Sequence, residues 1–162
     1  MQKVLVLGLG NDLLTDDAVG LHVAAEVRRR LGGDPVIAVK STMEMGSGLL
    51  DLIAGCERLV IVDSIQTGRA PAGHVHLIEP HRFRRHCTRA PHALGIEETC
   101  ALGRSLGMPM PAQVRIVAIE VKDPFTMGTD MTPAVERAIE DAADAAVECA
   151  REFARAAPLA EA

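Results

Sequence analysis

The chain has 162 residues, a length that suits one compact domain, and 48% of them are hydrophobic. It holds three Phe and no Trp or Tyr, so the core must be aliphatic, and stacking platforms for single-stranded nucleic acid are lacking. The net charge of −5 argues against phosphate backbones as partners, and no stretch approaches the roughly 20 apolar residues of a membrane span. We therefore expect a cytoplasmic protein that binds neither nucleic acid nor membrane.

The four cysteines and the first residues exclude other classes. The cysteines are scattered and form no CxxC pair, so the sequence predicts neither a zinc ribbon nor a disulfide framework. The opening MQKVLVLGLG is too short for a signal peptide and reads as a strand. Reduced thiols in a cytoplasmic protein are the expected state.

Strand-like and helix-like segments alternate along the chain. The expected strands are rich in aliphatic residues and cover residues 3–10, 35–40, 58–65, 73–79 and 112–121. The expected helices carry apolar residues at helical spacing or lie between glycines, over 16–31, 46–55 and 91–107, and from residue 133 through apolar positions up to 153. This alternation predicts βαβ units and a sheet covered on both faces.

The fourth strand differs from the others because polar and apolar residues alternate in it. It follows a short connection rich in Gly and Pro, so we expect it to run antiparallel near an edge of the sheet. The chain contains no repeat and no linker. Residues 1–162 are therefore expected to form a single α/β domain, with residues 157–162 frayed.

The stretch GLGNDLLTDDAVG, residues 8–20, begins like a glycine-rich phosphate loop. However, Leu13 occupies the third glycine position of a dinucleotide fingerprint, and the second strand has no acid at its tip. Asp16 and Asp17 would also repel an anion at the start of the helix. One of these acids can cap the helix, which leaves the second unexplained. A nucleotide- or phosphate-binding domain stays open as a disfavoured alternative.

Several polar residues are expected to meet at the carboxyl ends of the strands, where open α/β sheets bind their ligands. Asp16 and Asp17 follow the first strand, and Asp63 ends the third. His92, in APHALG, opens a helix after a long loop that can bring its imidazole over this crevice. An equal alternative is that His92 bonds only to the backbone of its own helix.

Two carboxylates and one imidazole would make a set of two oxygen ligands and one nitrogen ligand. Such a set suits nickel, zinc and similar ions and leaves positions open for water or substrate. Without a metal, two close carboxylates would share a proton, as in aspartic proteases. Either state favours hydrolysis. His74 and His76 share a face of the fourth strand as a second possible ligand pair, although a solvated edge is the favoured interpretation.

Four segments in order resemble those of the nickel–iron hydrogenase maturation endopeptidases: VLVLGLGNDLLTDDAVG, LVIVDSI, PHALG and GTDMTPAVE. The resemblance implies a three-layer α/β/α sandwich around a five-stranded mixed, mostly parallel sheet with one antiparallel strand. It also implies a hydrolase, an aspartic-type endopeptidase that removes the C-terminal extension of a hydrogenase large-subunit precursor after nickel insertion. A hydrolase of the same fold with another substrate is the alternative.

The resemblance also assigns roles to individual residues. The three metal-contacting side chains of the family fall on Asp17, Asp63 and His92, and Asp16 is left as the helix cap. The metal is expected to be nickel presented by the substrate protein. One stretch, STMEMGSGLL, departs from the Gly-Thr segment of many members, with Met43 and Glu44 in place of smaller residues. Because this stretch would touch substrate, the departure bears on which precursor is processed.

Overall fold

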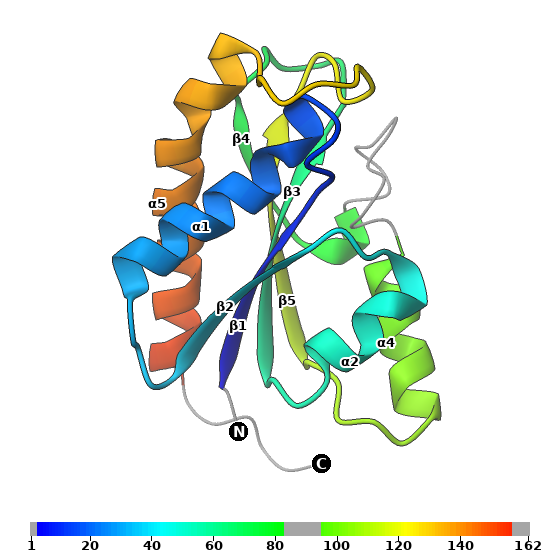
Figure 1. Ribbon diagram of the computed structural model, residues 1–162. Coiled ribbons are helices and arrows are strands. Elements are labelled where there is room, and N and C mark those ends of the chain that lie inside the picture. Colours follow the sequence, from blue (N-terminus) through cyan, green and yellow to red (C-terminus); the bar gives the residue numbers. More distant parts are fainter. Residues whose placement is uncertain (1–2, 83–94, 157–162) are drawn as a thin grey trace.

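The computed structural model describes residues 3–82 and 95–156 of the chain. Five strands form one sheet in the order β2-β1-β3-β5-β4, with α1 and α5 on one face and α2 and α4 on the other (Figure 1). The strands are β1 (Val4–Leu9), β2 (Ile37–Thr42), β3 (Arg58–Ile65), β4 (Val75–Ile78) and β5 (Gln113–Glu120). The main helices are α1 (Val19–Leu31), α2 (Leu50–Ile53), α4 (Ile96–Ser105) and α5 (Pro133–Arg155). The predicted three-layer α/β/α class is confirmed.

The strand directions agree with the sequence pattern. β1 lies parallel between β2 and β3, and β3 lies parallel to β5. β4 pairs antiparallel with β5 and forms one edge of the sheet, as expected from its alternating pattern. β5 follows β4 in sequence but lies between β3 and β4 in space. The sheet is therefore completed by a strand from the last third of the chain.

The sheet separates two aliphatic layers, because successive side chains of a strand point to opposite faces. The layer under α1 and α5 is rich in Val and Ala and includes Phe153 near the end of α5. The layer under α2 and α4 is rich in Leu and Ile. α1 buries the apolar stripe predicted for it, and Arg30 pairs with Glu26 one turn earlier at 2.7 Å. No helix in the described part of the chain could cross a membrane.

Candidate acid site at the carboxyl ends of the strands

The glycines of the first loop let backbone segments approach one another closely. A Cβ atom at Gly20 would lie 2.0 Å from the carbonyl oxygen of Leu9 and 2.6 Å from that of Val62. A Cβ atom at Gly8 would lie 2.3 Å from the carbonyl oxygen of Gly20. These glycines therefore allow the start of α1 to pack directly on β1 and β3. Packing explains the glycine pattern without a bound phosphate.

Asp16 does not cap α1, so the capping prediction is wrong. Residues Asp16–Ala18 form a 3-10 turn before α1, and neither this turn nor α1 has a side-chain capping bond. The Asp16 carboxylate instead accepts hydrogen bonds from Thr132 N at 2.7 Å and Thr132 Oγ1 at 3.0 Å. Thr132 is the N-cap residue of α5, with Pro133 at the first helical position as predicted. Asp16 thus ties the first loop to the last helix.

Asp17 and Asp63 are brought together by Ser64. Both acids are buried, at 1% and 0% exposure. Ser64 Oγ donates to Asp17 Oδ1 at 2.7 Å, and Ser64 N donates to Asp63 Oδ1 at 2.8 Å. We call Asp17, Asp63 and Ser64 the acid site. The sequence analysis did not predict a role for Ser64. Its position directly after Asp63, near the end of a buried strand, could have indicated one.

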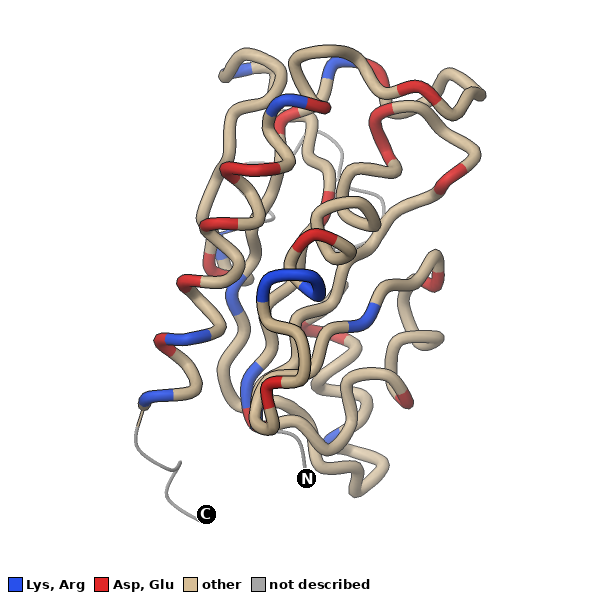
Figure 2. The backbone as a smooth tube through the Cα atoms, turned by 60° about the vertical axis from the view of Figure 1, so that its left-hand side comes forward, with Lys and Arg blue, Asp and Glu red and all other residues tan. Residues whose placement is uncertain are grey.

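The loops around the acid site carry more acidic than basic residues. They lie at the upper end of Figure 1, and Figure 2 shows this end of the tube with more red than blue. A negative potential in this region repels phosphate groups and attracts cations. The nucleotide-binding alternative is disfavoured by this charge and by the packing of Gly20.

The predicted nitrogen ligand, His92, lies outside the described residues. Within residues 3–82 and 95–156, no group of three or more His, Cys, Asp or Glu side chains is placed to hold a metal ion. The acid site therefore supplies two carboxylates, and His92 as the third ligand stays a prediction. The imidazoles of His74 and His76 contact each other edge to face, with ring centroids 4.6 Å apart.

Glu120, at the end of β5, is a buried acid that the sequence reasoning missed. It accepts hydrogen bonds from Thr67 N, Thr67 Oγ1 and Gly68 N at 2.8, 2.8 and 3.0 Å, and its Oε2 lies 3.0 Å from His76 Nε2. Burial acts to raise the pKa of Glu120, but the hydrogen bonds from Thr67, His76 and Gly68 outweigh it and hold the pKa below its ordinary value. Glu120 thereby fixes the segment that follows β3 against β4 and β5. The signal available in the sequence was an acidic residue that ends an otherwise apolar run in β5.

The geometry of the acid site suits hydrolysis. Two buried carboxylates, each oriented by a hydrogen bond from Ser64, lie at the carboxyl ends of neighbouring strands. Carboxylates in such a place can take a proton from water or bind a cation through oxygen. Because Asp17 and Asp63 are buried, their orientation is set by the protein rather than by solvent.

The chain is similar to a set of hydrogenase-processing enzymes. A family model described as "Hydrogenase maturation protease" matches residues 22–149. The Hydrogenase 2 maturation protease of Escherichia coli (strain K12) is 26% identical over 152 residues, which cover 93% of this chain and 92% of that protein. The hydrogenase expression/formation protein HupD of Bradyrhizobium diazoefficiens is 28% identical over 167 residues, which cover 98% of this chain and 86% of HupD.

Solved structures give the same result. The hydrogenase maturating endopeptidase HybD from E. coli superposes with a TM-score of 0.76 at 26% identity and covers 93% of each chain. The [NiFe] hydrogenase maturation protease HybD from Thermococcus kodakarensis has a TM-score of 0.69 at 22% identity, covering 92% of this chain and 99% of that one. The second likeness supports the fold alone, whereas the family model supports a shared class of protein.

Proposed function

Because the chain belongs to the hydrogenase maturation protease family and is a hydrolase of peptide bonds, we propose that it removes the C-terminal extension of a nickel–iron hydrogenase large-subunit precursor. The observation that carries this proposal is the meeting of Asp17 and Asp63 at Ser64. Two oriented carboxylates thus lie at the carboxyl ends of the central strands β1 and β3, where a folded partner could present its chain end. The proposed class is therefore an aspartic-type endopeptidase.

The proposal includes nickel as part of the substrate. Asp17, Asp63 and His92 would recognise a nickel ion that the precursor already holds. The two described members of this set are buried carboxylates, whose oxygens bind divalent cations. Three side chains with no cysteine among them leave coordination positions open, so the set suits a metal held by a partner better than a permanent structural metal. Nickel held there would supply Lewis acidity to a nearby water.

The residues of the acid site would carry out the proton transfers. A carboxylate of Asp17 or Asp63 takes a proton from the attacking water as its oxygen bonds to the scissile carbonyl carbon. The same proton then passes to the leaving amide nitrogen as the carbon–nitrogen bond breaks. Ser64 keeps both carboxylates in place through its hydroxyl and its backbone N–H. Holding the precursor by its nickel would fix the scissile bond beside these groups.

The test uses purified protein and a large-subunit precursor prepared with and without nickel. We expect the size of the large subunit to fall only for the nickel-containing precursor, and adding nickel to the protease alone should not rescue the other form. Equal cleavage of both forms would contradict nickel recognition. Asp17→Asn, Asp63→Asn and His92→Ala should each slow cleavage at least about 100-fold, because each removes a group that acts on the reacting atoms.

A matched control comes from the same loop. Asp12 is exposed and lies between the end of β1 and the buried acids. Asp12→Asn makes the same chemical change as Asp17→Asn and should leave cleavage near the wild-type rate. If Asp12→Asn is as slow as Asp17→Asn, the effect is one of loop charge, and the assignment of Asp17 is wrong.

A further inference from the structure

The outer edge of β4 has main-chain groups that face away from the sheet. Glu120 N donates to His74 O at 2.8 Å, and the register continues with His76 opposite Ala118. In an antiparallel pair, every second residue bonds to the partner strand. The N–H and C=O groups of His76 thus point to β5, and those of Val75 and Leu77 point outward.

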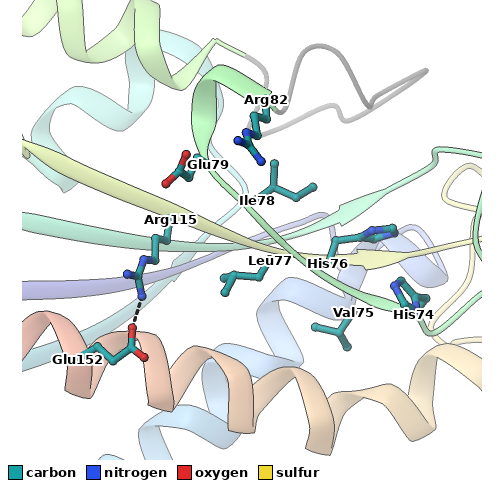
Figure 3. Close-up of a pocket in the computed structure, with 9 residues that line it drawn as sticks. All are labelled: His74, Val75, His76, Leu77, Ile78, Glu79, Arg82, Arg115 and Glu152. Carbon is teal, nitrogen blue, oxygen red and sulfur yellow. Dashed lines mark hydrogen bonds and ion pairs between the residues drawn. The ribbon is translucent and has the colours of Figure 1, made fainter.

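A hollow of about 690 Å³ runs along this edge, and Figure 3 shows its lining residues around β4. We call it the β4 groove. On one side Arg115, from β5, pairs with Glu152 of α5, and beyond the end of β4 lie Glu79 and Arg82. Leu77 lies between these groups and is 60% exposed. Native edge strands are usually protected by charge or cover, so an open edge with an exposed leucine indicates a place for a partner.

The shape of the β4 groove favours a single extended strand as its occupant. A single extended peptide has the width of one strand and can bond to Val75 and Leu77 through its own backbone. The four residues of β4 offer about 13 Å of edge, at roughly 3.3 Å per residue.

The groove begins close to the acid site. Asp63 pairs with Ala118, and Ala118 pairs with His76, so the three residues form one row across β3, β5 and β4. Side chains in such a row share a face of the sheet. Two strand spacings, or about 10 Å, separate Asp63 from His76, and a strand added outside β4 lies one spacing further, at about 14 Å. A chain leaving the acid site can cover this distance with about four extended residues.

We propose that the segment of the precursor that follows the cleaved bond binds in the β4 groove as an added strand. This inference rests on the proposed function, because it assigns the substrate of the acid site a path along the sheet edge. The strand runs parallel to β4, from His76 toward Arg82. An apolar side chain of the segment packs on Leu77. Among the described residues Arg82 makes no ion pair, so it can bind an acidic side chain or the terminal carboxylate of the segment.

Hydrogen exchange tests the added strand without requiring cleavage. The probe is a synthetic peptide with the sequence of the C-terminal extension of the host's hydrogenase large subunit. On adding it to the wild-type protein, we expect amide exchange at Val75 and Leu77 to slow at least about tenfold. The amides of His76 and Ile78 serve as internal controls, since they already bond to β5. Unchanged exchange at Val75 and Leu77 at saturating peptide would overturn the proposal.

A pair of variants tests the same contact with the complete precursor. Leu77→Pro removes an outward N–H and leaves the ladder to β5 intact, a position at which edge strands tolerate proline. Leu77→Ala keeps that N–H and loses only the side chain. We expect Leu77→Pro to lower kcat/KM about tenfold, mainly through KM, and Leu77→Ala to lower it less.

The two experiments separate this inference from the proposed function. If the wild-type protein cleaves the precursor but Leu77→Pro cleaves it equally well, strand addition is wrong and the proposed function stands. If no precursor is cleaved, the proposed function fails, and the exchange of Val75 and Leu77 still decides whether the peptide binds to β4. If the melting temperature of Leu77→Pro is well below that of Leu77→Ala, the proline has damaged the fold, and hydrogen exchange alone decides whether the peptide adds to β4.

Discussion

Asp17 and Asp63 in the acid site are at most 1% exposed, whereas Leu77 in the β4 groove, on the same sheet, is 60% exposed. The acids are held by hydrogen bonds from Ser64, and their loop is packed on the sheet through Gly20. Within residues 3–82 and 95–156, no strand pairs with the outer edge of β4 in the groove. Under the proposed function, groups that act on the scissile bond need a fixed orientation, whereas a surface that receives a peptide backbone must stay open. Substitutions near the acids should therefore change stability, and those in the groove should change recognition alone.

Among substitutions in the first loop, β5 and the groove, the largest effect on folding is expected from Gly20→Ala at the start of α1. The new Cβ would lie 2.0 Å from one backbone oxygen and 2.6 Å from another, so α1 must move away from the sheet. Overpacking of this kind costs about 1–3 kcal/mol, and a backbone contact places it at the upper end of that range. Urea unfolding measures the loss. Gly32→Ala is the control, because its Cβ would have no contact under 3.8 Å. Equal stability of the two variants would contradict the close packing of α1.

The second effect concerns the contact between the first loop and α5. Asp16→Ala removes the acceptor of two hydrogen bonds from Thr132, and one donor is a backbone N–H at the start of a helix. The expected loss is about 1–3 kcal/mol by urea unfolding, and Asp16→Asn should lose less because its oxygen still accepts. Asp12→Ala, in the exposed part of the loop, should change stability by less than about 0.5 kcal/mol. If the two alanine variants unfold alike, the contact contributes nothing.

The third prediction concerns Glu120, which connects the segment after Asp63 to β4. Its pKa in the folded protein is lowered, so the charged form stabilises the fold at pH values above the ordinary pKa of Glu. This stability is lost as the pH falls through the lowered pKa. Glu120→Gln should therefore be less stable than wild type at neutral pH, and the gap should shrink on acidification. Urea unfolding at several pH values measures it, with the exposed Glu148→Gln as control. If the difference in stability between wild type and Glu120→Gln grows toward acid pH, the pKa of Glu120 is raised rather than lowered, and the prediction is wrong.

The smallest effect is expected in the groove. Leu77→Ala should change the free energy of unfolding by less than about 0.5 kcal/mol, because the leucine side chain is mostly in water already. Leu7→Ala makes the same change at 0% exposure and should cost about 2–5 kcal/mol. Thermal or urea unfolding of the two variants gives the contrast directly. A large loss in Leu77→Ala would mean that the groove is part of the core, and strand addition there would be excluded.

Local patterns were enough to predict most of the fold. The apolar run of β3 matched residues 58–65, because a central strand buried on both faces needs no alternation. The stripe of α1 and the Thr-Pro start of α5 are equally local signals. The alternating pattern of β4 indicated an antiparallel edge strand, as found.

Contacts between distant parts of the chain could not be predicted in this way. Asp16 looked like a cap for its own helix, and its partner Thr132 lies 116 residues away. Glu120 binds a loop more than fifty residues earlier in the chain. The convergence of Asp17 and Asp63 was expected because it follows from strand order, whereas their shared partner Ser64 depends on side-chain geometry.

The contact between Asp16 and Thr132 also has a consequence for the order of biosynthesis. The ribosome makes Asp17 and Asp63 in the first half of the chain, long before β5 takes its place beside β3. The first loop receives its bond from Thr132 only when the start of α5 has been translated. A nascent chain therefore carries both acids before it has the framework that orients them. Under the proposed function, proteolytic competence therefore requires that the start of α5 has been made and has bound the first loop.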